Sequence, residues 1–380
     1  MLGNGGTMEF SIEKEIFLKG LSRVQGIVEK RNTIPILSNV LIESNSEGIF
    51  ITATDLEVGM KAFYPAEILK SGKTTISAKK LYEITKELPD KEILFKSKDN
   101  SWVEIKCGKS VFNIVGLAAD EFPYFPEPEN DRFIKINSNI IREMIDKTYF
   151  SISTDETKYN LNGIFFKTDD FNDDEKTLSL IATDGHRLSM IKKRVMNHQI
   201  KELEKGVIFP KKGIFELKKI TDDGQADIEL GFMDNNAVIK KDTTFIIMRL
   251  VDGEFPDYKR VVPQNNDLVI TVNKDLFYHS LKRISILSNE KSKGIKLTIK
   301  NNILELSSSN SEFGEAREEL DIEYQGPEIT IGYNARYIMD VLQSQDSDKI
   351  EINIKDHLSP GLIKSYNDND YLAVIMPMRL

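Results

Sequence analysis

The stretch that decides the fold is Ile12-Glu-Lys-Glu-Ile-Phe-Leu-Lys-Gly-Leu-Ser-Arg-Val24. It has two counterparts further along the chain, Ile136-Asn-Ser-Asn-Ile-Ile-Arg-Glu-Met-Ile145 and Val272-Asn-Lys-Asp-Leu-Phe-Tyr-His-Ser-Leu-Lys-Arg-Ile284. Each begins as a short strand, continues through a polar helix start and then carries apolar residues at helical spacing. The pattern recurs after 124 and then 136 residues, which is the size of a domain and far above a solenoid period. We therefore predict one domain present in three copies.

Two further landmarks recur in the same order and give each copy a second helix. A turn motif recurs as Ala53-Thr-Asp-Leu56, Ala182-Thr-Asp-Gly185 and, more loosely, Ser308-Ser-Asn-Ser311. A strand running into a helix recurs as Ile76-Ser-Ala-Lys-Lys-Leu81, Ile208-Phe-Pro-Lys-Lys-Gly213 and Ile331-Gly-Tyr-Asn-Ala-Arg-Tyr337. The remaining segments alternate apolar and polar residues between turn signals, as antiparallel strands do. The predicted class is α+β, with two helices beside antiparallel sheets in each copy.

The domain boundaries follow from length and from two linker-like segments. A chain of 380 residues exceeds what one hydrophobic core normally organises. Proline-rich and acidic stretches at 121–131 and 254–267 lie where the repeats end. We predict domains at 8–131, 132–265 and 266–380, preceded by a disordered leader or vector-derived residues at 1–7. No apolar run is long enough to cross a membrane and no secretory signal begins the chain, so we expect a cytoplasmic protein.

The charges are segregated along the chain. The six predicted helix windows, 13–31, 79–91, 139–147, 211–219, 274–283 and 334–345, carry a net charge of +8. Because the whole chain has a net charge of −9, the remainder carries −17. Basic helices on an acidic body suit a protein that presents its helices to a polyanion. Exposed lysines that only keep the protein soluble are the alternative reading of the same pattern.

An enzyme is the rival class, with Asp184, His186 and Asp55 as a carboxylate and imidazole set for hydrolysis. The four histidines are not at metal-ligand spacing, and no serine or cysteine lies in a nucleophile motif. Asp55 and Asp184 occupy equivalent repeat positions, which favours a structural role in a turn. We therefore predict no catalytic residues, no metal and no cofactor. A scaffold that binds proteins but never DNA is a third reading.

Six segments in order resemble the bacterial DNA sliding clamp family, the beta subunit of the replicative DNA polymerase III. They are Thr33-Ile-Pro-Ile-Leu37, Leu161-Asn-Gly163, Ala182-Thr-Asp-Gly-His-Arg-Leu188, Phe255-Pro-Asp-Tyr-Lys-Arg-Val261, Ile286-Leu-Ser-Asn-Glu-Lys291 and Val374-Ile-Met-Pro-Met-Arg-Leu380. The resemblance spans residues 8–380. It implies three clamp domains that form half of a six-domain ring, closed by a second copy. Such a ring encircles duplex DNA without reading its sequence, slides along it and tethers the polymerase as a processivity factor.

The resemblance also implies three sets of site residues. Residues facing DNA are expected at Arg31, Lys30, Arg23, Lys79, Lys80, Lys147, Tyr159, Lys211, Lys212, Lys282 and Arg283. A cleft between domains 2 and 3 is expected to bind short peptides of the polymerase catalytic subunit, the ATP-dependent clamp loader, other polymerases and repair proteins. Its wall is expected at Leu161, Thr183, Gly185, His186, Arg187, Leu188, Pro256, Arg260, Val261, Tyr337, Leu358, Pro360, Val374, Met376, Pro377, Met378, Arg379 and Leu380. The homodimer interface is expected at Phe112, Ile114, Ile286 and Leu287.

The residue types of the expected cleft suit peptide binding, and one residue near the expected DNA-facing set differs from the family pattern. Leucine, valine and proline form an apolar pocket, methionine adapts to different peptides, and arginine binds backbone or carboxylate groups at a rim. The alternative reading is that Leu161 and Val374 are ordinary core and that the Met-Pro-Met tail is a plain strand. Asn160 lies where the family pattern has a second aromatic residue, so the resemblance does not imply that single-stranded template stacks there.

Overall fold

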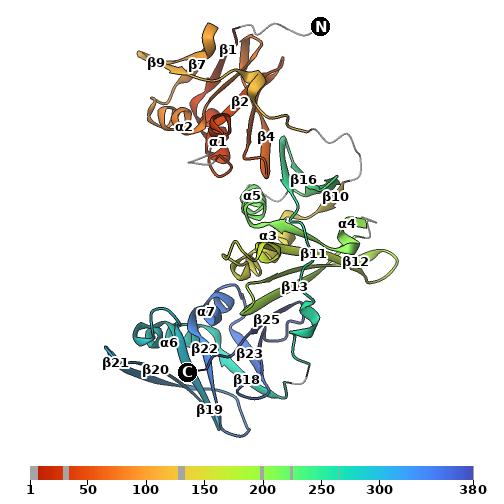
Figure 1. Cartoon of the computed structure of the whole chain (residues 1–380), viewed down its shortest axis with the longest axis vertical. Coiled ribbons are helices and arrows are strands. Elements are labelled where there is room, and N and C mark those ends of the chain that lie inside the picture. The colour runs from red at the N-terminus through yellow and green to blue at the C-terminus, as the bar shows by residue number, and fades with distance from the viewer. Residues whose placement is uncertain are drawn as a thin grey trace. The chain divides into compact units, whose positions relative to one another are not determined.

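A computed structural model describes residues 7–28, 34–126, 133–196, 201–222, 226–264 and 266–379. The chain comprises two compact units, Met1–Ser138 with Phe215–Leu250 and Asn139–Ile214 with Val251–Leu380. The first and third repeats each belong to one unit, and the middle repeat contributes strands to both. None of the helices in the described ranges has the length and apolar character that a membrane crossing requires. Figure 1 shows the elements of both units.

Within these ranges each repeat carries two helices of nine or more residues, as predicted. They are α1 (Lys14–Val24) and α2 (Ala78–Glu87), then α3 (Ser138–Asp146) and α5 (Lys211–Thr221), then α6 (Lys274–Ile284) and α7 (Ala335–Gln343). The first helix is shorter than the predicted window, because Gly26 and the β-branched residues after it are poor helix formers. The sequence pattern missed the one-turn helix α4 (Lys201–Lys205), in which Leu203 is the only buried side chain.

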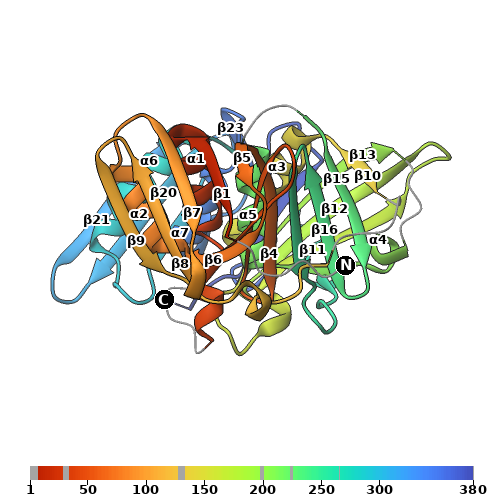
Figure 2. The same cartoon turned by 90° about the horizontal axis from the view of Figure 1, so that it is seen from above.

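Unit 1 contains two antiparallel sheets. The order in the five-stranded sheet is β5 (Glu67–Lys70), β1 (Glu9–Glu13), β7 (Glu92–Ser97), β8 (Trp102–Cys107) and β9 (Ser110–Val115). The order in the eight-stranded sheet is β10 (Ile134–Ile136), β15 (Ile228–Met233), β16 (Asn236–Lys241), β17 (Thr244–Arg249), β4 (Val58–Pro65), β3 (Gly48–Thr54), β2 (Asn39–Ser44) and β6 (Lys73–Ser77). Helices α1 and α2 contact each other, and α1 also packs on β3 and β4. Figure 2 shows β1, β7, β8 and β9 side by side.

Unit 2 follows the same plan with two further antiparallel sheets. The order in the eight-stranded sheet is β14 (Val207–Pro210), β11 (Gly163–Asp170), β12 (Glu175–Thr183), β13 (Arg187–Met196), β25 (Tyr371–Ile375), β24 (Gly361–Ser365), β23 (Lys349–Ile354) and β18 (Leu268–Asn273). The order in the four-stranded sheet is β21 (Gly314–Asp321), β20 (Ile303–Asn310), β19 (Gly294–Lys300) and β22 (Ile329–Asn334). Helices α6 and α7 contact each other as α1 and α2 do.

Consecutive repeats are joined by strand pairing. β4 of the first repeat pairs with β17 of the second, with Ala62 opposite Thr244. β13 of the second repeat pairs with β25 of the third, with Ile191 opposite Tyr371. The same junction therefore occurs once in each unit. Within the described sheets, β9 and β21 are left as edge strands at the two ends of this series.

The helices are held by equivalent apolar positions in different repeats. In α1 the residues Phe17, Leu21 and Val24 are buried at a spacing of three to four residues. The corresponding residues of α6 begin with Phe277 and Leu281, which are also buried. Burying one apolar face of each helix against a sheet supplies the main stabilisation of such a layer. The apolar positions that recur in the sequence are thus the positions that are buried in these helices.

Candidate functional site

The turn between β12 and β13 is held by its own side chains. The Asp184 carboxylate accepts hydrogen bonds from the backbone N–H groups of His186 at 2.9 Å and Arg187 at 3.0 Å. The Thr183 hydroxyl accepts from the Gly185 N–H at 3.1 Å and donates to the Arg187 carbonyl at 2.6 Å. Gly185 has a φ of +90°, which glycine adopts without steric cost. Through these hydrogen bonds Asp184 stabilises the backbone conformation of the turn.

The first repeat builds the same turn with the same bonds. The Asp55 carboxylate accepts from the backbone N–H groups two and three residues further on, at 2.9 and 2.7 Å. Leu56 replaces Gly185 and keeps a positive φ of 78°. In the third repeat the Asn310 side chain accepts from the equivalent N–H groups at 2.9 and 3.4 Å. Asp55 and Asp184 therefore have the structural role in a turn that their repeat positions predicted.

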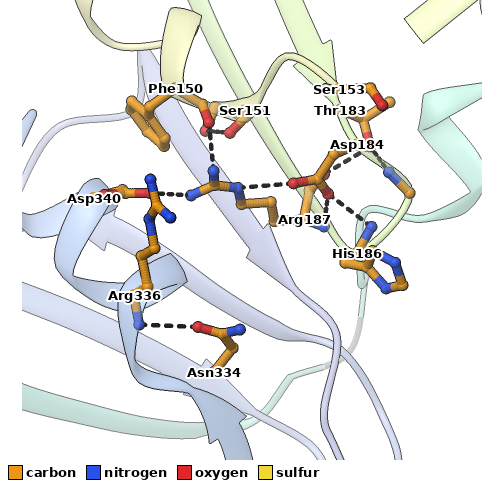
Figure 3. A network of polar contacts seen from close by, with 12 residues as sticks. Phe150, Ser151, Ser153, Thr183, Asp184, His186, Arg187, Asn334, Arg336 and Asp340 are labelled. Carbon is orange, nitrogen blue, oxygen red and sulfur yellow. Dashed lines mark hydrogen bonds and ion pairs between the residues drawn. The ribbon is translucent and has the colours of Figure 1, made fainter. Parts of the chain in front are cut away.

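Arg187 connects this turn to helix α7 (Figure 3). Its guanidinium donates to Asp184 at 3.1 Å, to Asp340 at 2.6 Å and to the Phe150 carbonyl. The guanidinium carbon also lies 4.4 Å from the centre of the Tyr337 ring, a cation–π distance. Only 8% of Arg187 is exposed. Arg187, which was expected at the rim of the cleft, is thus buried, and its hydrogen bonds connect the second repeat to the third.

An apolar cluster lies behind the turn. Leu188 of β13 is opposite Val374 of β25, and both pack with Tyr258 and Leu362 in one buried cluster. Burial raises the pKa of Tyr258 above its ordinary value. The expected peptide wall is therefore backed by a buried apolar layer.

The chain end crosses from one sheet to another beside this cluster. The Met376 N–H donates to the His186 carbonyl at 2.9 Å, next to the turn. Two residues later, the Met378 N–H donates to the Gly332 carbonyl of β22 at 2.8 Å. These two bonds fix the Met-Pro-Met segment against both the second and the third repeat. Met376 is 37% exposed, so part of its side chain faces solvent.

The expected cleft residues differ in accessibility. The exposed ones are Gly185, His186, Pro256, Arg260, Val261, Leu358, Met376 and Arg379. Partly buried are Thr183, Tyr337, Pro360, Pro377 and Met378. Buried are Leu161, Arg187, Leu188 and Val374, while Leu380 lies outside the described residues. The accessible and partly buried members are therefore the ones that a peptide could touch directly, and the buried members support them.

The sequence did not indicate Asp340 or Phe150 as members of this site. Asp340 is 153 residues from Arg187 in the chain, and Phe150 contributes only a carbonyl group. No local pattern connects such residues. The one available signal was the helical position of Asp340, one turn after Tyr337 on α7.

The loop that carries Tyr159 lies beside the segment that leads to Tyr258. A Cβ atom at Gly253 would lie 3.2 Å from the Tyr159 ring, so the ring approaches this backbone closely. The Asn160 side chain donates to the Glu254 carbonyl at 3.0 Å. Tyr159 is 60% exposed and its ring remains accessible. Asn160 therefore anchors the loop by a hydrogen bond at the position where an aromatic residue was expected.

The expected DNA-facing residues fall into four groups. Exposed are Lys79, Lys80, Tyr159, Lys282 and Arg283, and partly buried are Arg23, Lys211 and Lys212. Lys147 is only 6% exposed and pairs with Glu143 at 3.0 Å and Asp346 at 3.7 Å. That expectation for Lys147 needs correction, because a buried and paired ammonium is not available to a phosphate. Lys30 and Arg31 lie outside the described residues.

The expected interface residues lie at the two ends of the strand series. Phe112 on the edge strand β9 is 39% exposed, and Ile286, just after α6, is 77% exposed. Ile114 and Leu287 are partly buried. Exposed apolar side chains on an edge strand favour pairing with another chain. Among the described residues, no group of three or more histidine, cysteine, aspartate or glutamate side chains could hold a metal ion.

Models of three protein domains match the chain in order. They are the N-terminal, central and C-terminal domains of the DNA polymerase III beta subunit, at residues 8–126, 135–257 and 259–379. The beta sliding clamp of Caulobacter vibrioides is 35% identical over 375 residues, covering 98% of this chain and 100% of the relative. The chain belongs to the beta sliding clamp family.

Other members of the beta sliding clamp family give the same result. The beta sliding clamp of Haemophilus influenzae is 33% identical over 380 residues and is covered in full, against 98% of this chain. The crystal structure of the C. crescentus clamp superposes with a TM-score of 0.94 at 34% identity, covering 99% of this chain and 100% of that one. A Bartonella birtlesii sliding clamp, solved with griselimycin bound, has a TM-score of 0.93 at 33% identity and the same coverage.

Membership confirms the predicted fold and function. Sliding clamps are non-enzymatic processivity factors that tether polymerase to DNA, and this chain is a processivity clamp with three clamp domains. The prediction that the chain is not an enzyme is confirmed by the family. The exact domain boundaries and the individual site residues remain predictions.

Proposed function

We propose that two copies of this cytoplasmic chain close head to tail into a ring around duplex DNA. The observation that carries the proposal is the unfinished series of strand junctions. β4 pairs with β17 and β13 pairs with β25, each joining one repeat to the next. In the third repeat, β21 occupies the position that β4 and β13 occupy in the first and second repeats. In the first repeat, β9 occupies the position that β17 and β25 occupy in the second and third repeats. Pairing β21 of one copy with β9 of another completes the series.

Chemistry at the two edges supports this pairing. β9 exposes Val111, Phe112 and Val115, and Ile286 is exposed near the other end of the series. β21 reads Gly-Glu-Ala-Arg-Glu-Glu-Leu-Asp and is acidic. Lys109 lies immediately before β9, and Lys106 of the neighbouring strand β8 is opposite Val111. Apolar burial and opposite charges therefore both favour the contact between copies. Because a head-to-tail contact joins unlike surfaces, it must be made twice before the ring closes.

The proposed ring holds DNA by enclosure. Accessible cations from several repeats, Lys79, Lys80, Lys282 and Arg283 among them, are our candidates for phosphate contacts. Phosphate contacts position a duplex without reading its sequence and weaken as salt increases. Such contacts let the ring slide, while its closed topology prevents escape. The acidic remainder of the chain repels other nucleic acid.

We propose that the surface around the 183–188 turn and the 376–379 tail binds short peptides. The partners are the polymerase catalytic subunit, the ATP-dependent clamp loader, and other polymerases and repair proteins. Partly exposed Met376 and Met378 offer adaptable apolar contact, and exposed Arg260 and Arg379 offer charge at the edge. A shared site of this kind makes partners compete for one clamp.

Retention on DNA of different topology tests the proposal. The clamp is loaded by its ATP-driven loader onto nicked circular DNA, and half of the sample is then cut once to give linear ends. We expect long retention on circles and rapid loss from linear DNA of the same length. Equal retention on both would refute enclosure and would favour a scaffold or an adhesive DNA-binding protein.

A further inference from the structure

The Arg187 guanidinium is bound at each of its three nitrogen atoms (Figure 3). Its Nε atom donates to Asp184 at 3.1 Å, its Nη1 atom to Asp340 at 2.6 Å and its Nη2 atom to the Phe150 carbonyl. Because a guanidinium is planar and its donors point in fixed directions, three acceptors leave it one orientation. The Tyr337 ring lies over this cation, with its centre 4.4 Å from the guanidinium carbon. The position of the Tyr337 ring is therefore coupled to the orientation of Arg187.

Helix α7 supplies both Asp340 and Tyr337. The two residues lie three positions apart, so their side chains leave the helix on one face, where both contact Arg187. Burial raises the pKa of Tyr337, and the nearby Asp184 carboxylate raises it further. Tyr337 therefore lies partly buried beside the 183–188 turn, which is part of the proposed peptide surface.

The junction between the first and second repeats is built without this arginine. Its turn is held by Asp55 through the same backbone hydrogen bonds, and its strands β4 and β17 pair as β13 and β25 do. The residue three positions after Asp55 is Val58, which takes the place of Arg187 and is buried. The turn and the strand junction therefore do not require a guanidinium at this position.

The acidic partner is present at both junctions, but it pairs differently. Helices α5 and α7 each begin directly after a strand, and the sixth residue is Glu216 in one and Asp340 in the other. Glu216 pairs with Lys219 on its own helix at 2.9 Å. Asp340 instead reaches Arg187 of the second repeat. A contact between repeats thus accompanies the turn that belongs to the proposed peptide surface.

We infer that Asp340 is a positioning residue of the peptide surface, which holds the Arg187 guanidinium and thereby sets the Tyr337 ring relative to the 183–188 turn. The inference rests on the proposed binding of peptides at this surface. Without the Asp340 carboxylate, Arg187 keeps Asp184 as a charged partner, so its charge stays compensated while one of three directional contacts is lost. Asp340 acts through Arg187 and does not have to touch the peptide.

Peptide titration of the full chain tests the inference. A fluorescein-labelled synthetic peptide with the sequence of the polymerase tail is titrated with wild type and with Asp340→Ala, and fluorescence anisotropy gives the Kd. We expect Asp340→Ala to weaken binding about tenfold, the effect of one charge-assisted hydrogen bond. Asp340→Asn keeps a neutral acceptor of the same shape and should recover part of the affinity. The Tm of each variant is measured first, and every titration is made at a temperature at which the variant is folded.

Asp346→Ala is the matched control for Asp340→Ala. Asp346 also pairs with a buried cation, Lys147 at 3.7 Å, and that cation keeps its second partner Glu143. The same carboxylate is thus removed from a buried ion pair that does not involve Arg187. We expect this variant to bind the peptide as wild type does.

A double-mutant cycle separates positioning from a general structural role. Tyr337→Ala removes the ring that Asp340 is inferred to position, and this change is combined with Asp340→Ala. If Asp340 acts through the ring, Asp340→Ala should change the Kd by less than about twofold once the ring is gone. A general loss of structure would weaken binding by the same factor in both backgrounds.

The possible results distinguish failure of this inference from failure of the proposed function. Wild-type protein that binds no peptide would overturn the peptide surface and the inference with it. Wild-type binding that Asp340→Ala leaves unchanged would overturn the inference alone. An additive cycle, or an equal loss of affinity in Asp346→Ala, would also overturn the inference alone.

Discussion

Arg187 holds together two segments that are 153 residues apart in the sequence. Its bonds to Asp184, Asp340 and the Phe150 carbonyl are made in a nearly solvent-free position. Removing one partner of a buried ion pair leaves the other charge without compensation. We expect Arg187→Ala to lower the free energy of unfolding by about 2 to 4 kcal/mol. Urea unfolding followed by circular dichroism measures this change.

Arg260 provides the control for Arg187. Its side chain is 86% exposed and, among the residues that the structure describes, forms an ion pair only with Asp257, which is itself exposed. We expect Arg260→Ala to change stability by less than about 0.5 kcal/mol. If both variants lose stability equally, the proposed link between the second and third repeats is wrong.

The two equivalent turns make an internal test of backbone strain. Leu56 has a φ of 78° where the second repeat has Gly185 at 90°. A side chain in this conformation costs about 1 to 2 kcal/mol, less what glycine loses in the unfolded chain. We therefore expect Gly185→Ala to destabilise the fold by about 1 kcal/mol and Leu56→Gly to stabilise it by about 0.5 kcal/mol.

A steric clash would not cause the expected destabilisation by Gly185→Ala, because the added Cβ atom would meet only the Lys158 ammonium, at 3.6 Å. Equilibrium unfolding in urea measures both changes. A stable Gly185→Ala variant would mean that the turn relaxes into another conformation. A shift of its φ in a crystal structure of that variant would show the relaxation directly.

For single residues, the sequence predicted the structural role of a side chain better than the residues with which it pairs. The structural role of Asp55 and Asp184 followed from their equivalent positions and is seen in their backbone hydrogen bonds. The burial of Lys147 was not predictable: its partner Glu143 is one helical turn away, but its second partner Asp346 is distant in sequence. Long-range charge pairing is decided by tertiary packing, which periodicity does not contain.

The last strand and the tail after it form the element on which peptide binding should depend. Met376 and Met378 are fixed by backbone hydrogen bonds to His186 and Gly332. We expect deletion of residues 376–380 to abolish binding of a short peptide from the polymerase tail, because it removes the accessible apolar surface beside the turn. Isothermal titration calorimetry measures the peptide affinity.

Light scattering on the same variant checks that its assembly state is unchanged, since the deletion lies outside β9 and β21. An unaltered peptide affinity would show that the binding surface lies elsewhere. Loss of assembly together with loss of binding would show that the tail has a wider structural role.

At the element scale the repeat register carried most of the prediction. It located the six longer helices of the described ranges, because each buries an apolar face with a period close to 3.6 residues. It missed α4, where a single buried leucine gives no period. It also did not indicate that the middle repeat would divide its strands between two compact units. Sheet partners across a repeat junction depend on tertiary pairing and leave no local pattern.

The assembly state is the prediction that belongs to the whole molecule. One chain has a mass of 43.3 kDa, and we expect light scattering to give about twice this value at micromolar concentration. Replacing Ile286 with aspartate places a charge in the proposed contact and should shift the mass toward that of one chain. Leu276→Asp is the control, because Leu276 is 61% exposed on α6 and lies outside the predicted set.

A wild-type protein that stays a single chain would contradict the ring. A mass change in the Leu276→Asp control as large as that of Ile286→Asp would contradict the assignment of the interface residues. The two outcomes are separate, so each tests a different part of the proposal.

The antiparallel ladders that join consecutive repeats also determine where the assembly is mechanically weakest. Tension at the β4–β17 or β13–β25 joint is shared by several hydrogen bonds and by the covalent backbone that links the repeats. A β9–β21 joint between two copies is held by strand pairing and side-chain contacts alone, because no covalent backbone connects the two copies. Force applied to the closed assembly would therefore rupture it first at a joint between copies, leaving each chain folded and able to reseal.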